Sequence, residues 1–295
     1  MISAAMVKEL RERTGCGMMD CKKALADAEG NMDKAIDILR EKGMAKAVKK
    51  SGRIASEGLV DIVVDGGVGA MIEVNSETDF VAKNDIFQEY VEDAAKVALA
   101  TNGEVCDMKT FACPKCSKSF EDRLTDMIAK IGENMNLRRF ARYEGGVVGY
   151  VHAAGRIGVM VKVEADLSNS AAVTAAKDAC MQIAAMNPAY LDKSVVPAED
   201  IEKEKSIILA QIKEDPKNAN KPENILEKMV DGKINKFFEE SCLLQQKFVK
   251  DDKTTVEKYL AANGVKLVDF ARFEKGEGLE KKEDDFAAEV ANMAK

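Results

Sequence analysis

Tryptophan is absent from this 295-residue chain, and histidine occurs only once, at His152. A single histidine excludes a zinc site built from several histidines, and it leaves any Ser-His or Cys-His catalytic pair dependent on one residue. The sequence also lacks a GxSxG nucleophile motif, a GxxxxGK[ST] phosphate-binding loop and a GxGxxG dinucleotide motif. We therefore expect a protein that is not an enzyme and that carries no cofactor.

Long apolar runs are missing too, since none reaches the ~18 residues that a membrane-spanning helix needs. The 51 acidic residues outnumber the 44 basic ones, and a formal charge of -7 opposes binding to nucleic-acid phosphates. The seven cysteines are an odd number spread over a long chain, which is typical of reduced cytosolic thiols and not of a secreted disulfide framework. We expect a soluble cytoplasmic protein that binds neither nucleic acid nor membranes.

The N-terminal part, residues 1–53, predicts a module of three helices. Apolar residues recur at helical spacing in the first and third helices: Ile2, Met6, Val7 and Leu10, then Met32, Ala35, Ile36 and Leu39. A middle helix between Gly17 and Gly30 has Met18, Cys21, Leu25 and Ala28 on its apolar face. Met19 falls outside this face and should be exposed. The basic, glycine-containing stretch 45–58 predicts a linker, with a domain boundary near residue 53.

A strand-strand-loop-helix unit follows in residues 54–143 and recurs in residues 144–274. The segment 58–60 matches 146–148 at an offset of 88, and 69–72 matches 158–161 at an offset of 89. A longer repeat, 137–144 and 267–274, predicts a third strand in each copy. In the first copy we expect a surface loop over 75–84 and a helix capped by Asp85 and Gln88. The fold class is therefore α+β, with a duplicated core of two antiparallel sheets and their helices.

Two helical segments accompany this core. Residues 197–240 predict a protruding helical hairpin within the second subdomain, because Pro216 and Pro222 interrupt its helical pattern. Residues 275–295 predict a C-terminal helical module in which Phe286, Val290 and Met293 share one face.

The cysteines at 113 and 116 have the spacing of a zinc knuckle, and Cys106 precedes them by seven residues. They lie in an apparent loop insertion over 102–118. A zinc site would need a fourth ligand from Cys180, Cys242 or an acidic residue, because a second CxxC pair is missing. A structural metal site, a redox-active dithiol and incidental thiols all stay open, and we favour incidental thiols.

The segment Thr78-Asp79-Phe80-Val81 is unusual, because an apolar Phe-Val pair stands among charged residues in a predicted surface loop. Phe80 could fold back as a lid on its own sheet, or it could anchor a partner protein. The equivalent stretch of the second copy, 165–168, has no aromatic residue. The shared fold therefore does not need Phe80, which favours the anchor.

Four segments of the sequence carry a specific resemblance: 7–25, 78–83, 131–134 and 285–291. Through them the chain resembles the elongation factor Ts family, the guanine-nucleotide exchange factors of bacterial elongation factor Tu, over nearly its whole length. The resemblance implies a ubiquitin-associated-like N-terminal module, the duplicated core, the hairpin and the terminal module. The CPKC segment at 113–116 departs from the family pattern.

The resemblance also implies a mechanism. Asp79 and Phe80 would enter a crevice of elongation factor Tu near its magnesium and phosphate sites and promote GDP release during translation elongation. The other contact residues that it implies are Thr78, Val81, Arg11, Met18, Met19, Ile131, His152, Phe286 and Val290. The partner would be elongation factor Tu in its GDP-bound and nucleotide-free forms, and a dimer of the complex stays open. The rival interpretations are a redox protein built on the CPKC segment and a bare ubiquitin-associated-type scaffold.

Overall fold

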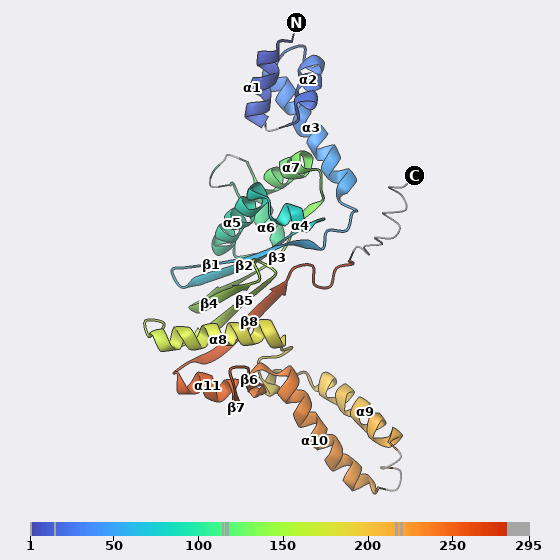
Figure 1. Cartoon of the computed structure of the whole chain (residues 1–295), viewed down its shortest axis with the longest axis vertical. Helices are drawn as coiled ribbons and strands as arrows, with labels where there is room; N and C mark the ends of the chain where they lie inside the picture. Colours follow the sequence, from blue (N-terminus) through green and yellow to red (C-terminus); the bar gives the residue numbers. More distant parts are fainter. Residues whose placement is uncertain are drawn as a thin grey trace.

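Three helices, α1 (Ala4–Thr14), α2 (Met18–Asp27) and α3 (Met32–Lys50), form the N-terminal end of the molecule (Figure 1). The computed structural model describes residues 2–281 except 15, 114, 116, 117, 216, 217, 219 and 220. Leu10, Cys21 and Leu25 are fully buried between the three helices. The Asn31 side chain caps α3 by accepting a hydrogen bond from the Lys34 amide at 3.0 Å.

Helix α3 is longer than the sequence pattern predicts. It continues through the expected linker to Lys50, because the run Ala45–Lys50 holds good helix formers and no proline. Its C-terminal half packs on α7 (Phe120–Ile131), and Ala47 contacts the first core. The predicted linker over 45–58 is therefore wrong: only 51–56 separate α3 from the first strand.

Each copy of the duplicated unit forms a three-stranded antiparallel sheet. The first sheet has the order β1 (Glu57–Asp65), β2 (Val68–Ser76), β3 (Met135–Glu144), and the second has the order β4 (Gly146–His152), β5 (Ile157–Glu164), β8 (Lys266–Glu274). The repeated segments pair identically, since Ile72 lies opposite Phe140 and Val161 lies opposite Phe270. Both sheets also shift register at the same place, after Glu73 and after Lys162. The predicted third strands and antiparallel α+β class are confirmed.

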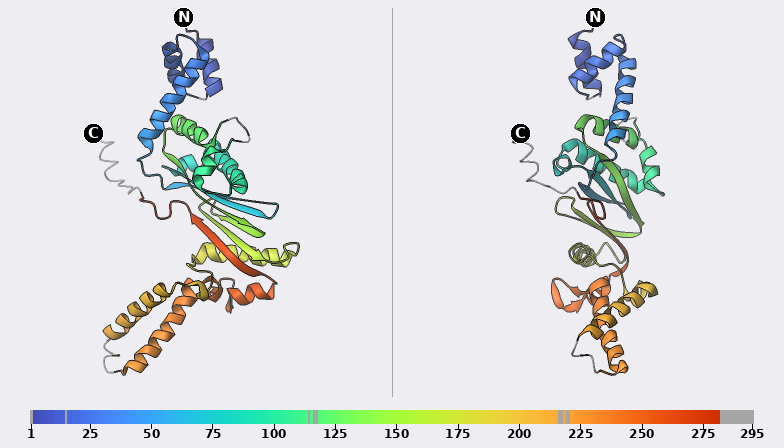
Figure 2. Two further views of the ribbon diagram at one scale, coloured as in Figure 1. Left: turned by 180° about the vertical axis from the view of Figure 1, so that it is seen from behind. Right: turned by 90° about the vertical axis from the view of Figure 1, so that its right-hand side faces the viewer.

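The helices cover the outer faces of these sheets (Figure 2). The first sheet carries α4 (Asp79–Ala82), α5 (Asp85–Ala100), α6 (Val105–Thr110) and α7; the second carries α8 (Ser170–Met186) and α11 (Val256–Ala262). Asn84 caps α5 by accepting a hydrogen bond from the Ile86 amide at 3.0 Å. The expected Asp85 and Gln88 cap is wrong, because the asparagine one residue earlier takes that position.

The inner faces of the two sheets pack against each other around Val60, Met71, Val147 and Met160. Equivalent glycines permit this close approach. A Cβ on Gly69 would lie 2.8 Å from the Met160 sulfur, and one on Gly158 would lie 2.9 Å from the Met71 sulfur. The two copies thus contact each other reciprocally, as expected for an internal duplication.

The hairpin of α9 (Ala198–Glu214) and α10 (Glu223–Ser241) projects from the second subdomain (Figure 1). Its helices pack through the apolar residues Ile208, Ile212, Leu226, Val230 and Ile234. A short 3-10 helix (Lys193–Val195) precedes the hairpin. The hairpin is followed by another 3-10 helix (Leu243–Gln245) and by a two-stranded ribbon of β6 (Lys247–Phe248) and β7 (Asp251–Thr255). Within the described residues, no helix is both long and apolar enough to cross a bilayer. The predicted C-terminal helix, with Phe286 and Val290, lies outside the described residues.

Candidate protein-interaction site

Phe80 stands on a one-turn helix, α4, which follows β2 directly. Its side chain is 78% exposed, more than any other large hydrophobic side chain in the described part of the chain. The next two residues, Val81 and Ala82, are buried in the first core. The turn therefore directs Val81 inward and Phe80 outward. The expected loop is wrong in detail, because residues 79–82 form a helical turn. The exposure of Phe80 also contradicts the alternative of a lid on its own sheet, and Phe80 is not among the residues packed on the first core.

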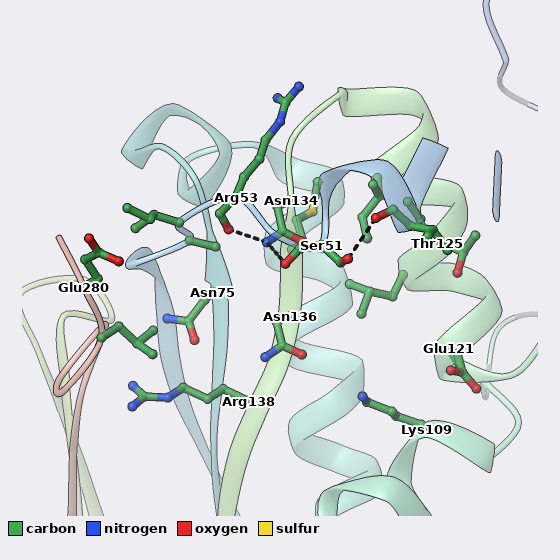
Figure 3. A pocket seen from close by; sticks show the side chains of 18 residues that line it. Ser51, Arg53, Asn75, Lys109, Glu121, Thr125, Asn134, Asn136, Arg138 and Glu280 are labelled. Carbon is green, nitrogen blue, oxygen red and sulfur yellow. Dashed lines mark hydrogen bonds between the residues drawn. The ribbon is translucent and has the colours of Figure 1, made fainter. Parts of the chain in front are cut away.

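Residues distant in sequence fix this turn from below. The Glu133 carboxylate accepts hydrogen bonds from the Thr78 amide at 3.0 Å and from the Thr78 hydroxyl at 2.8 Å. Glu77 accepts one from the Asn134 amide at 2.6 Å. The Asn134 side chain in turn donates to the Arg53 carbonyl at 2.7 Å, as Figure 3 shows. The start of α4 is thus tied both to the α7–β3 connection and to the segment after α3.

An ion pair flanks the exposed ring. The Lys83 ammonium lies 2.6 Å from the Asp79 carboxylate and 5.8 Å from the centre of the Phe80 ring. The hydrogen bond from Lys83 lowers the pKa of Asp79 below its ordinary value, so the carboxylate is ionised at neutral pH. The turn therefore presents an aromatic surface with fixed charges beside it, and this combination is typical of a protein-binding anchor.

A groove of about 720 Å³ adjoins Phe80. One wall consists of Glu77, Thr78, Asp79 and Phe80, and the other contains Arg156, Glu274, Lys275 and Lys281. A second hollow of about 590 Å³ lies between the end of α3, α7 and β3 (Figure 3). Asn75, Asn134 and Asn136 contribute amide groups to its lining.

Comparison with known proteins identifies the family of this chain. The sequence profile of the family Elongation factor TS matches residues 77–277, a range that contains the α4 turn, β3 of the first sheet and the whole second sheet. The chain is 48% identical to Elongation factor Ts of Clostridioides difficile, over 100% of this chain and 99% of that protein. It is 51% identical to Elongation factor Ts of Nitratiruptor sp., over 100% of this chain and 99% of that protein. The chain belongs to the elongation factor Ts family.

The remaining residues implied by the family resemblance lie in three places. Arg11, Met18 and Met19 are exposed on the N-terminal module, at one end of the molecule (Figure 1). Met18 was expected on the buried face, but it is 56% exposed because it begins α2, where the helix extends beyond its own core. Ile131 is half-buried at the end of α7.

His152 is exposed at the end of β4, and its Nδ1 lies 2.9 Å from the Tyr150 hydroxyl. The turn that follows it contacts β1 through a hydrogen bond from the Val60 amide to the Gly155 carbonyl at 2.8 Å. A groove of about 420 Å³ separates this turn from Asp85 and Gln88 at the start of α5. His152 thus lies on the second copy but near the helix that follows the Phe80 turn.

Sequence reasoning assigned no role to Glu77, Glu133 or Asn134, although they hold the Phe80 turn. The signal was present, since 131–134 is one of the four segments of family resemblance. Its meaning depends on a hydrogen bond between residues 55 positions apart, which no local pattern indicates. Val81 is the opposite case: the resemblance implies it as a contact residue, but its side chain is buried and does not lie on the exposed surface.

The cysteine segment is described only in part. Cys113 is buried, and its sulfur accepts hydrogen bonds from the Arg123 guanidinium at 3.0 Å and from the Lys115 amide at 3.3 Å. Cys116 and the side chain of Cys106 lie outside the described part. Among the residues that are described, no three histidine, cysteine or acidic side chains gather in a metal-binding arrangement. The question of zinc therefore keeps its three alternatives.

Proposed function

We propose that this protein is a guanine-nucleotide exchange factor of elongation factor Tu in translation elongation. The exposed Phe80 on a firmly held turn is the observation that carries the proposal. Membership of the elongation factor Ts family supports the choice of partner. In this proposal Asp79 and Phe80 enter the partner near its magnesium and phosphate site, and the protein itself performs no covalent chemistry.

The physical basis is a linkage between two ligands of one protein. A factor that binds nucleotide-free elongation factor Tu more tightly than the GDP-bound form must weaken GDP binding by the same factor. Burying an aromatic ring in a partner's crevice provides such a preference if the ring fits the crevice better in the nucleotide-free form than in the GDP-bound form, and this is the preference that we propose. The ties from Glu133 and Glu77 support this role, since a preorganised turn loses little conformational entropy on binding.

Further contacts belong to the same proposal. Arg11, Met18 and Met19 would hold the partner from the N-terminal module, and Ile131 and His152 from the core. Phe286 and Val290 would add a contact from the C-terminal segment. In this proposal the partner is bound in its GDP-bound and nucleotide-free forms in the cytoplasm, and a dimer of the complex stays open.

Release of fluorescently labelled GDP from purified elongation factor Tu tests the proposal. We expect the observed release rate to rise with the concentration of this protein and then to saturate. Binding to elongation factor Tu with an unchanged release rate would favour the bare scaffold instead. Activity that appears or vanishes with oxidation of the thiols would favour the redox interpretation.

A further inference from the structure

A buried acidic residue, Glu73, lies on β2 at the centre of a charged cluster. Its side chain is 0% exposed. Its carboxylate accepts hydrogen bonds from Arg138 at 3.0 Å and from Arg139 at 2.5 Å. It also accepts one at 2.8 Å from the amide of Gly276, 203 residues away in the sequence. Burial alone would raise the pKa of Glu73, but the hydrogen bonds from Asn75, Gly276 and Arg139 outweigh it and hold the pKa below its ordinary value.

The cluster fixes the segment 274–281, which we call the strap. Arg138 donates a second hydrogen bond to the Glu277 carbonyl at 2.6 Å, and Arg139 lies 3.2 Å from the Glu277 carboxylate. Gly276 has a φ of +70°, and a Cβ at this position would lie 2.0 Å from the Ser56 carbonyl oxygen. The strap is therefore held by side chains of the first sheet and by a close backbone contact that only glycine permits.

The second copy of the fold shows that the sheet does not need this cluster. At the repeat offsets, Lys162 corresponds to Glu73 and Asp269 corresponds to Arg139. Strand pairing confirms the correspondence, since Glu73 lies opposite Arg139 and Lys162 lies opposite Asp269. The charges are inverted there, and Asp269 is exposed. The same sheet thus forms without a buried acid at this position.

The strap reaches the proposed interaction site. Glu274, Lys275 and Lys281 form one wall of the groove whose other wall is the Phe80 turn. Lys275 also forms an ion pair with Glu57 at the start of β1. A buried carboxylate is costly unless it is paired, so an acid that gathers two arginines and the Gly276 amide is better explained by holding the strap than by sheet stability.

We propose that Glu73, Arg138 and Arg139 are positioning residues that clamp the strap, so that the groove beside Phe80 is preformed for elongation factor Tu. This inference rests on the proposed function. The clamp acts through the strap and touches no nucleotide. Its loss should weaken complex formation, because the partner would then have to order the strap on binding.

Two full-length variants test the clamp from its two sides. Glu73→Gln removes the charge but keeps the size, and Gly276→Ala displaces the strap without changing the clamp residues. We expect each to raise the concentration that gives half-maximal GDP release about three- to tenfold, with the saturating rate unchanged because Phe80 is intact. The double variant should be no weaker than the weaker single variant, because both act on the same element. Lys162→Gln is the matched control and should behave as the parent.

Protection of the Gly276 amide against hydrogen exchange gives a second readout, and it should fall in both single variants. A loss of saturating rate and of thermal stability in Glu73→Gln, with Gly276→Ala unaffected, would show that the cluster only supports the core. Additive effects in the double variant would likewise overturn the inference. If the parent protein accelerates GDP release and both variants match it, the clamp is wrong and the proposed function stands; if the parent itself has no effect, the proposed function fails first.

Discussion

The two copies of the core differ at the point where the second strand ends and the covering helix begins. Both copies reach this point with the same strand register, the same register shift and equivalent glycines at the sheet interface. In the first copy Phe80 then projects into solvent, whereas in the second copy Leu167 is half-buried and packs on its own core. The duplicated fold thus accommodates an apolar residue after this strand without exposing it. The exposure of Phe80 is a property of one copy and calls for a functional explanation.

The two turns are also held differently. In the second copy Asp166 accepts hydrogen bonds from the amide and the hydroxyl of Ser168, two residues further along. In the first copy Thr78 donates its hydrogen bonds to Glu133, which lies in the connection after α7. A local bond orders only the turn itself, while a distant one fixes the turn relative to the whole subdomain. The Phe80 turn is therefore hydrogen-bonded to a distant part of its subdomain, as the second turn is not in these two bonds.

The largest effect should come from Phe80→Ala. Truncating a central aromatic anchor costs about 2 kcal/mol or more of binding free energy. The rate of catalysed GDP release, measured at a limiting concentration of this protein, should therefore fall about 30-fold. Its free energy of unfolding should stay within about 0.5 kcal/mol of the parent, because the ring is exposed. Both quantities can be measured on one preparation by GDP release and urea denaturation.

Leu167→Ala is the matched control for this prediction. It should lower stability, since Leu167 packs on the second core, and leave GDP release unchanged. An unchanged release rate for Phe80→Ala would contradict the functional difference between the copies.

The next largest effect is expected at the equivalent glycines that the two copies place at the sheet interface. Gly69→Ala and Gly158→Ala should each destabilise the protein by about 1–3 kcal/mol, because the new methyl group enters the packed sheet interface. A Cβ would approach Val147 to 2.4 Å in the first case and Val60 to 2.4 Å in the second. Urea denaturation of the two variants should give similar losses. A loss confined to one variant would show that the interface is less symmetric than the contacts indicate.

The duplicated fold could be predicted from the sequence, because internal repeats and alternating apolar residues can be recognised in a single sequence without knowledge of the tertiary contacts. The repeat at 137–144 and 267–274 even placed the third strands, which are far from their partners in sequence. Sequence reasoning missed the length of α3, because a basic stretch of helix formers reads as a linker until its packing on α7 is known. It also missed Glu133 and Glu73, whose roles exist only through partners that folding brings together. Exposure of Phe80 was inferred from its charged neighbours, but the short helix that exposes it depends on the burial of Val81.

A smaller effect is expected at the support of the Phe80 turn. Glu133→Ala removes the acceptor of the Thr78 amide and hydroxyl, and water can replace part of it because Thr78 is half-buried. We expect a loss of about 1 kcal/mol of binding free energy, measured as an about fivefold lower rate of GDP release at a limiting concentration of this protein. Asp166→Ala, which removes the corresponding local support in the second copy, should leave release unchanged. Equal effects of the two variants would mean that the distant tie has no special role.

The smallest effect concerns the attachment of the N-terminal module, which only the first copy carries. Arg40 on α3 lies 2.7 Å from Asp122 on α7. Both side chains are partly exposed, so Arg40→Ala should weaken the attachment by about 0.2–1 kcal/mol, and high salt should reduce the difference. The hydrogen bond from Arg40 lowers the pKa of Asp122 below its ordinary value of 3.8. The stabilisation is therefore fully present above pH 3.8 and is lost as the pH falls through the lowered pKa.

Limited proteolysis of the 51–56 connection at pH 7 measures this attachment, because loosening of α3 from α7 exposes the connection. The protease should cut Arg40→Ala faster than the parent. The melting temperatures of the two proteins should become equal once the pH falls below the lowered pKa of Asp122. Lys42→Ala is the control, since Lys42 pairs with Asp27 inside the N-terminal module and crosses no boundary. Equal cleavage of all three proteins would mean that apolar packing of Ala47 against the first core holds the module alone. The N-terminal contact residues would then be positioned by α3 without help from this ion pair.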